Sequence, residues 1–221
     1  MRVFNLKRLV ITAILILKVI FAYTDNTSRL ARLHYDGGGD WYNDRDIIPN
    51  ITNYLNEELN TAFSTQQEIV KASEMKINDH PFIFLTGHGN ITFSNKEAEN
   101  LRSYLQKGGF LYADDDYGMD ESFRREIKKV FPDKDLVELP ASHKVFNCYF
   151  QFDNGIPKIH KHDDKRPQAF AIFSDTGRMM VLYTYEANIS DGWSNMHDDP
   201  QSVREKAFRM GANIFYYLLT Q

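Results

Sequence analysis

Short hydrophobic runs alternate with amphipathic stretches along most of the chain. Residues 82–86 are a near-continuous apolar run, which is typical of a strand buried on both faces of a parallel sheet. Residues 30–35 (LARLHY) and 110–113 are predicted as further strands. Residues 47–59 and 94–108 instead repeat their apolar side chains close to helical spacing. This alternation of strand and helix predicts βαβ units and a parallel sheet.

The predicted helices carry boundary signals. Residues 94–108 open with SNKE, a capping box in which the serine hydroxyl accepts a backbone amide and the glutamate reaches back, and they end at a Gly-Gly pair. Residues 120–131 begin with two acids, which favour the positive end of the helix dipole, and stop at a proline. Residues 202–219 open with SVRE, which we interpret as a second capping box.

Weaker patterns complete the expected fold. Residues 62–65 are a candidate second strand, and residues 67–75 a short helix. Residues 169–173 and 179–185 are strand-like and are separated by SDTGR, a hairpin turn signal. We therefore expect one α/β domain over residues 30–221. It would be a three-layer sandwich with a mostly parallel central sheet, helices on both faces and an antiparallel hairpin near the C-terminus.

The first 22 residues are interpreted as an export signal peptide. Basic residues precede an apolar stretch, and Ala22 offers a small residue at a cleavage point. Residues 23–29 are then a short polar lead-in. An uncleaved membrane anchor is the alternative, but the apolar run contains Lys18 and is shorter than the roughly 20 residues that a span needs. We expect an exported protein, periplasmic or envelope-associated, with no membrane span after cleavage.

Charge and cysteine usage exclude some functions. Without residues 1–22 the chain has 22 basic and 30 acidic residues, a net charge of −8, which argues against nucleic-acid binding because that needs a basic patch. The remaining length supports a core without disulfides. Cys148 is the only cysteine and lies in the aromatic run VFNCYF. We expect a buried structural thiol there.

Two polar segments follow the carboxyl ends of apolar strands, where open α/β sheets bind ligands. The loop TGHGN at 86–90 presents His88 as a general acid/base, a metal ligand or a hydrogen-bond donor, unless the backbone holds it. The run Asp114-Asp115-Asp116 places three carboxylates together, and these repel unless a cation, a proton or a donor compensates. A hard divalent ion takes such oxygen ligands. Other ligand contact, or a solvated capping turn, are the alternatives.

Other segments add candidates. The loop DGGGDWY at 36–42 lacks both phosphate-loop patterns, and its acids with aromatics suit a sugar or peptide, unless Trp41 is a core anchor. His160 and His162 would share one side of a strand and suit a transition metal, although the surrounding lysines favour a solvated loop. Glu186 and residues 191–199 either fold over the same crevice or simply lead to the last helix.

The segments RLHYDGGGDWYND, FLTGHGN, LRSYLQKGGFLYADDDYGMDESFRREIKKVFPD and YEANISDGW resemble a bacterial family called domain of unknown function 4159. The resemblance runs over residues 30–219. It implies a flavodoxin-like fold similar to class I glutamine amidotransferases and trehalose-utilisation-type domains, with undetermined activity. The amidotransferase nucleophile is a cysteine on a strand-to-helix turn. Asp114 and Asp115 occupy that turn here and Cys148 lies elsewhere, so the resemblance does not imply amidotransferase activity.

We therefore expect a non-catalytic binding or assembly module of the cell envelope, with a carbohydrate, a peptide or an envelope protein as its partner. The alternative is a hydrolase, with or without a divalent metal, acting on a carbohydrate or peptidic envelope substrate. It requires two catalytic groups within reach of one shared point. The expected catalytic residues are His88 and Asp115; the expected ligand contacts are Asp36, Gly38, Asp40, Trp41, Gly87, Asn90, Asp114, Asp116, Tyr117 and Trp193; and the expected metal ligands are Asp114 and Asp116. The oligomeric state and the metal's identity stay open.

Overall fold

A computed structural model describes residues 28–162 and 164–221 of the chain. The predicted export signal therefore lies outside the described residues. Among the helices of the described part, none combines the length and the apolar character that crossing a membrane requires.

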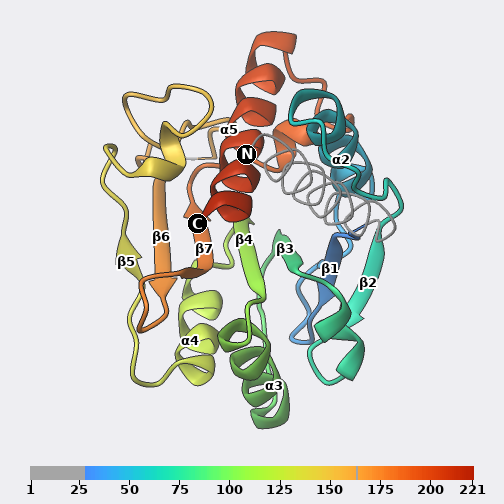
Figure 1. Cartoon of the computed structure of the whole chain (residues 1–221), viewed down its shortest axis with the longest axis vertical. Helices are drawn as coiled ribbons and strands as arrows, with labels where there is room; N and C mark the ends of the chain where they lie inside the picture. Colours follow the sequence, from blue (N-terminus) through green and yellow to red (C-terminus); the bar gives the residue numbers. More distant parts are fainter. Residues whose placement is uncertain (1–27, 163) are drawn as a thin grey trace, which may run out of the picture.

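The described chain forms one mixed seven-stranded sheet with strand order β2-β1-β3-β4-β7-β6-β5 (Figure 1). Strands β2, β1, β3, β4 and β7 run parallel, β6 is antiparallel to β7, and β5 is antiparallel to β6. The mostly parallel sheet and the β6–β7 hairpin confirm the sequence prediction. The strands are β1 (Ala31–His34), β2 (Glu68–Lys71), β3 (Phe82–His88), β4 (Phe110–Tyr117), β5 (Val137–Glu138), β6 (Gln168–Phe173) and β7 (Met179–Tyr185).

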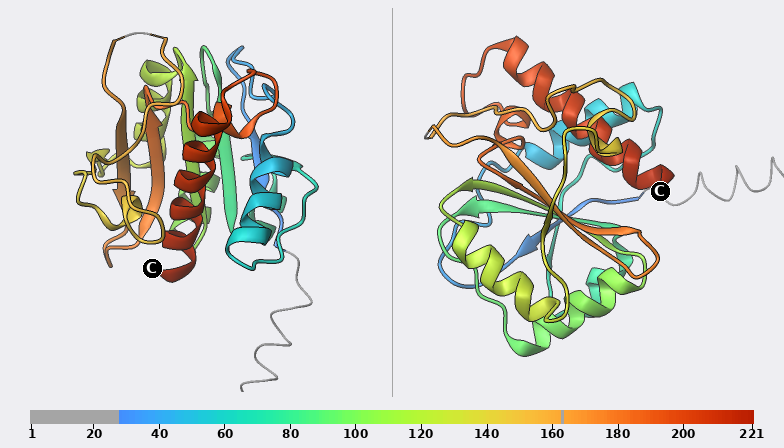
Figure 2. Two further views of the ribbon diagram at one scale, coloured as in Figure 1. Left: turned by 90° about the horizontal axis from the view of Figure 1, so that it is seen from above. Right: turned by 90° about the vertical axis from the view of Figure 1, so that its left-hand side faces the viewer.

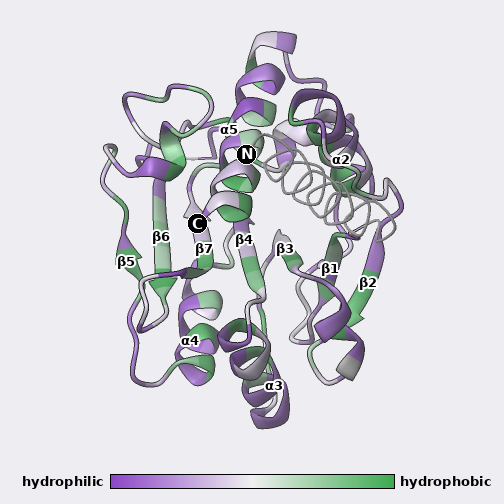
Figure 3. Ribbon diagram, in the orientation of Figure 1, coloured by the Kyte–Doolittle hydropathy of each residue, from purple (hydrophilic) through white to green (hydrophobic). Residues whose placement is uncertain are grey.

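Helices cover both faces of this sheet, with α3 and α4 on one side and α2 and α5 on the other (Figure 2). Side chains alternate along each strand, so β3 sends Ile83 to the α3/α4 core and Phe84 to the α2/α5 core. Figure 3 shows hydrophobic colour along the strands and polar colour on the outer loops. The helices are α2 (Ile47–Glu58), α3 (Asn95–Gln106), α4 (Asp120–Val130) and α5 (Gln201–Thr220), with 3-10 turns η1 (Met75–Asp79), η2 (Lys144–Phe146) and η3 (Asp191–Trp193).

The two predicted capping boxes have different outcomes. At α3 the Ser94 hydroxyl accepts the amide of Glu97, and the Glu97 carboxylate accepts the Ser94 amide at 2.9 Å, which confirms the prediction. At α5 the N-cap is Pro200, with no side-chain cap. Ser202 therefore lies inside the first turn, where its own backbone is helical and cannot act as the cap. The prediction of a second capping box is wrong.

The second strand and the thiol also differ from expectation. The structure has β2 at Glu68–Lys71, so the predicted strand at 62–65 and helix at 67–75 are wrong. Only Val70 of the four β2 residues is fully buried, and pairing with β1 selects the strand. Cys148 follows η2 outside any strand and is half-buried, with its thiol 3.2 Å from the Asn213 carbonyl.

The topology determines where the site lies. The chain passes from β2, at one edge, across β1 to β3, so the strand order reverses between β1 and β3. Ligands in open α/β sheets bind at such switch points, outside the carboxyl ends of the strands. The carboxyl ends of β1, β3, β4 and β7 all meet at this edge because the four strands are parallel.

Candidate functional site

Strand β4 runs through the three aspartates to Tyr117, so they lie on a strand rather than in the loop expected after it. Successive side chains on a strand point to opposite faces. Asp114 and Asp116 therefore face the α2/α5 side, and Asp115 faces the α3/α4 side together with Tyr183. This split decides what each carboxylate contacts.

Asp114 is fully buried and serves to hold the segment after β7. Its carboxylate accepts the Ser190 amide at 2.6 Å, the Ser190 hydroxyl at 2.7 Å, and the Thr184 hydroxyl. Burial raises the pKa of Asp114 to about 7 against the lowering effect of these donors. These three donors occupy the carboxylate and give Asp114 a structural role. Asp114 is therefore not placed to act as the metal ligand that we expected.

Asp115 is 3% exposed and contacts the start of α4. It accepts the Met119 amide at 3.1 Å and the Tyr183 hydroxyl at 3.3 Å. Burial is the main cause that raises the pKa of Asp115 to about 6. His88 lies on the α2/α5 side of the sheet, where it contacts Asp116. It therefore does not approach Asp115, with which we expected it to form a catalytic pair.

His88 instead bridges two other carboxylates. Its Nδ1 lies 3.0 Å from an Asp40 oxygen and its Nε2 lies 3.2 Å from Asp116 Oδ2. The His88 backbone amide also donates to Asp40. Burial lowers the pKa of His88, but Asp116 and Asp40 outweigh burial and the pKa is raised. The imidazole side chain is 44% exposed, so it is accessible from solvent. We call the histidines and aspartates joined by these contacts, here His88, Asp40 and Asp116, the cluster.

Asp116 is the buried centre of this arrangement, 3% exposed. Its carboxylate accepts Asn43 Nδ2 at 2.6 Å and Asn188 Nδ2 at 3.3 Å, and Asn188 also donates to its backbone carbonyl at 2.5 Å. Burial and the nearby Asp191 charge raise the pKa of Asp116 to about 7, against the His88 charge.

Asp191, at the start of η3, joins a second histidine to the cluster. His160 Nδ1 lies 2.8 Å from Asp191, and His160 Nε2 lies 2.8 Å from Asp199. The hydrogen bond to Asp191 raises the pKa of His160 to about 9, against burial and with help from Asp199. Burial raises the pKa of Asp191, but the hydrogen bonds from His160 and Asn188 together lower it by more, so the pKa lies below its ordinary value.

His197 is the third histidine of the cluster. Its Nε2 lies 2.5 Å from Asp44, and its ring centroid is 5.0 Å from that of His160. Burial lowers the pKa of His197, but Asp44 and Asp191 raise it above its ordinary value. The Asp44 contact engages Nε2 and leaves Nδ1 for another partner.

Two groups of side chains in the described chain could hold a metal ion, and they share Asp191. In His160–Asp191–His197 and in Asp116–His162–Asp191 the ligand atoms all lie within 4.8 Å of one another. Two ligands about 2.1 Å from one ion lie at most about 4.2 Å apart, so small side-chain rotations would close either set. Of the expected metal ligands, Asp116 is in such a group and Asp114 is in neither.

Outer carboxylates orient two of these histidines. Asp199 engages Nε2 of His160 and Asp44 engages Nε2 of His197. A metal-bound histidine commonly gives its other nitrogen to a carboxylate, which fixes the tautomer and the ring orientation. The cluster therefore has the chemistry of a metal centre as well as that of a hydrogen-bond network.

The glycine-rich loop packs against the loop after β3 rather than enclosing an empty cradle. A Cβ on Gly39 would lie 2.7 Å from the His88 carbonyl, and one on Gly87, whose φ is +136°, would lie 2.6 Å from the Tyr35 hydroxyl. Asp36 joins the same packing through its carbonyl, which accepts the Thr92 amide at 2.7 Å. The glycines thus bring Asp40 to His88.

Two further expected contacts differ in their surroundings. Gly38 is exposed, and a Cβ at this position would meet no atom within 4 Å. The Asn90 side chain donates to the Gly37 carbonyl at 3.0 Å and accepts from Arg125 at 3.0 Å, so it ties the loop together. Gly38 is free to meet a ligand, whereas the Asn90 amide already has protein partners.

A buried arginine positions the loop after β1. Arg32 is fully buried and donates to the carbonyls of Trp41 at 3.1 Å, Asn43, and Asp44 at 2.9 Å. Burial lowers its pKa to about 10. Trp41 stacks on His34 with ring centroids 4.1 Å apart and is partly buried.

The aromatic candidates divide between core and rim. Trp193 is 1% exposed and its indole donates to the Ala207 carbonyl at 2.9 Å, so it packs in the α2/α5 core and offers no face to a ligand. Tyr117 is 51% exposed beside His162, at 4.8 Å between ring centroids, and Tyr42 is 54% exposed. A cavity beside Asp116 measures only about 10 Å³, so it suits an ion better than a substrate.

Half of the residues of the cluster were not identified as site residues from the sequence. The missed residues are Asn43, Asp44, Asn188, Asp191, His197 and Asp199. The dense acid and histidine content of residues 186–199 is the available signal, but on sequence alone that segment is interpreted as a lid or a connection.

Comparison with known proteins places the chain in a family. The model of the family described as domain of unknown function (DUF4159) matches residues 29–219, so the chain belongs to that family. No curated protein matches it.

Proposed function

We propose that this member of the DUF4159 family is an exported binding module of the cell envelope that holds one divalent transition-metal ion in its histidine–aspartate cluster. The observation that carries the proposal is Asp191. It is 2% exposed and belongs to both three-ligand groups, with ligand atoms within 4.8 Å. The module would assemble its partner-binding surface around this metal.

The charges of the cluster support a cation. Asp116 and Asp191 are both buried, and Asp191 raises the pKa of Asp116. Two such carboxylates repel each other unless a proton, a cation or hydrogen-bond donors compensate, and a cation would add to the donors already present. Imidazole ligands favour zinc, iron, nickel or copper over calcium or magnesium, and carboxylates also suit manganese. Zn²⁺ and Mn²⁺ are therefore the ions to test first.

We also propose that the fold is the flavodoxin-like three-layer sandwich of class I glutamine amidotransferases, without their chemistry. Helices on both faces of a mostly parallel sheet support the fold. The turn between β4 and α4, where the nucleophile cysteine is expected, consists of Gly118 and Met119 and holds no cysteine. Burial raises the pKa of the Cys148 thiol, which disfavours the reactive thiolate. Both observations support binding rather than acyl transfer.

A metal-assisted hydrolase acting on a carbohydrate or peptidic envelope substrate is the second candidate, and one observation favours it. His88 is 44% exposed, lies 3.2 Å from Asp116 and is oriented by Asp40. In that function His88, rather than Asp115, would move the proton. Tyr42 and Tyr117, exposed on the rim, would contact the substrate.

The test measures metal content and melting temperature of purified protein, after chelation and after refilling with Zn²⁺ or Mn²⁺. We expect one ion per chain and a rise in melting temperature on refilling. Asp191→Asn should lose both. Asp115→Asn is the matched control, because it makes the same chemical change at a buried aspartate of β4 that faces the α3/α4 side, away from the cluster, and it should retain the ion.

Two results would decide between the functions. A parent protein that takes up no stoichiometric ion would contradict the metal centre. If the ion is present, hydrolysis of envelope glycan or peptide fragments that His88→Ala abolishes at unchanged metal content would favour the hydrolase. Binding of such fragments without turnover would support the module.

A further inference from the structure

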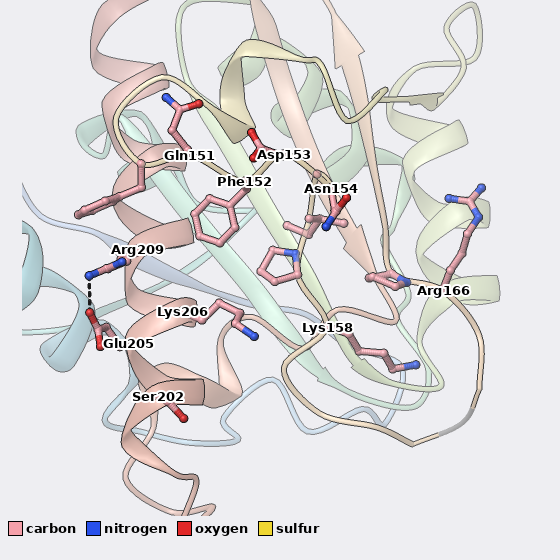
Figure 4. Close-up of a pocket in the computed structure, with 15 residues that line it drawn as sticks. Gln151, Phe152, Asp153, Asn154, Lys158, Arg166, Ser202, Glu205, Lys206 and Arg209 are labelled. Carbon is pink, nitrogen blue, oxygen red and sulfur yellow. Dashed lines mark ion pairs between the residues drawn. The ribbon is translucent and has the colours of Figure 1, made fainter.

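A second site lies apart from the cluster, where the loop at residues 150–158 faces α5. It is a groove of about 960 Å³, at the upper end of the usual range for small-molecule sites. Figure 4 shows Gln151, Phe152 and Asn154 on the loop side and Lys206 on the α5 side of this space.

The groove is rich in cations within an acidic protein. Its lining includes four cationic side chains, Lys158, Arg166, Lys206 and Arg209, against the two carboxylates Asp153 and Glu205. Arg209 forms an ion pair with Glu205, which also lines the groove (Figure 4). A cation of the lining that has no carboxylate partner would be the contact for an anionic ligand.

Lys206 is the cation best placed to meet that ligand. Lys158 pairs with Glu186 at 3.2 Å and Arg166 pairs with Glu138 at 2.6 Å, so both have carboxylate partners. Lys206 is exposed, and its amino group makes neither a hydrogen bond nor an ion pair with any described residue. Its amino group points into the space beside Phe152 (Figure 4).

The remaining lining is of the kind that binds a saccharide. Phe152 presents a half-buried aromatic ring, and Pro157 a second apolar surface. Asn154 is an exposed side-chain amide, which both donates to and accepts from hydroxyl groups. Gln151 is also exposed, but its amide nitrogen donates to the Asn147 carbonyl at 3.2 Å, so its oxygen is the atom offered to a ligand. An aromatic face packs against the apolar face of a sugar ring while amides bind its hydroxyls.

We propose that this groove binds an acidic oligosaccharide, with a sugar carboxylate on Lys206 and a sugar ring against Phe152. The proposal names a ligand class for the binding function proposed above, and it rests on that function but not on the metal. The groove adjoins the cluster through one loop. Lys158 lines the groove, and His160, two residues later, contacts Asp191. A ligand in the groove would therefore border the segment that carries a candidate metal ligand.

The test is calorimetric titration of the full protein, in chelator, with trigalacturonate and with its neutral methyl ester. We expect the acid to bind and the ester to bind much more weakly, with affinity for the acid falling as salt rises. Lys206→Gln should weaken binding of the acid by about five-fold. Lys107→Gln, an equal charge change at the end of α3 on the other face of the sheet, should leave it unchanged.

Phe152→Leu keeps an apolar side chain but removes the flat ring. We expect it to weaken binding of the acid while the melting temperature stays near that of the parent. Equal affinities for the acid and its ester, or for the parent and Lys206→Gln, would overturn the proposal. So would tighter binding of inorganic phosphate than of trigalacturonate. Because the titration is run in chelator, its outcome is independent of whether the metal centre exists.

Discussion

The metal-free protein should lose stability as the pH rises from 6.5 to 9, and His160 should be the main cause. Its pKa is about 9 in the folded protein and about 6.5 as a free side chain. A group whose pKa is higher in the folded state stabilises the fold while it is protonated. The contribution is therefore complete below pH 6.5 and is lost as the pH rises through 9.

The magnitude follows from the same two values. A pKa raised from 6.5 to about 9 corresponds to at most about 3 kcal/mol of unfolding free energy. The side chain is 20% exposed, so solvent screening makes this an upper limit. Asp116, whose pKa is raised from 3.8 to about 7, loses its contribution as the pH rises between these two values, so most of its effect falls below the His160 window.

Urea denaturation in chelator at pH 6.0, 7.5 and 9.0 measures this loss. His160→Gln cannot titrate, so its stability should fall less steeply over the window. The matched control is His143→Gln. His143 is half-buried beside η2, and burial is the main cause that lowers its pKa below the ordinary value of 6.5, in the direction opposite to His160. The reasoning fails if the parent and His160→Gln curves run parallel between pH 6.0 and 9.0.

Three substitutions test the framework of the site by urea denaturation. Gly87→Ala places a methyl group 2.6 Å from the Tyr35 hydroxyl at φ +136° and should cost about 1–3 kcal/mol or more. Arg32→Met leaves three loop carbonyls without their donor; we expect a loss of about 2–4 kcal/mol and a shift in Trp41 fluorescence as its loop loosens. Asp114→Asn replaces a carboxylate oxygen by an amide donor that faces existing donors, so we expect a loss of about 2–3 kcal/mol. A melting temperature within about 1 °C of that of the parent would contradict this expectation.

Much of the fold was predictable because its signals are local. The apolar runs that became β3 and β4 are buried on both faces, and the capping box of α3 acts within four residues. Strand β2 gave no such signal, since only Val70 in it is fully buried and its partner β1 lies far along the chain. The start of α5 was missed because a favourable cap sequence begins at Ser202, within the first turn of a helix whose N-cap is Pro200.

The candidate site was predictable in place but not in pairing. Strand–helix alternation brings His88 and the aspartate run to one edge of the sheet. Which face each aspartate takes depends on whether β4 continues past Ala113, where its apolar run stops. The structure continues the strand, and strand alternation then separates Asp115 from His88. The partners His160 and Asp191 lie far apart in the chain, and only the tertiary fold brings them together.

Protons and a metal ion are alternative ways to stabilise the cluster. Its contacts join the carboxylates of Asp40, Asp44, Asp116, Asp191 and Asp199 to the imidazoles of His88, His160 and His197. Carboxylates remain in excess even when every imidazole is protonated, and the excess grows as the imidazoles lose their protons. Metal ligands must be deprotonated, so metal affinity rises over the same pH range in which the protons leave. Hydrogen bonding alone does not require this excess of carboxylates, because the neutral amides of Asn43 and Asn188 already donate to Asp116. The retained excess of acid is the physical reason to expect that a cation restores, at neutral and alkaline pH, the stability that the metal-free protein loses.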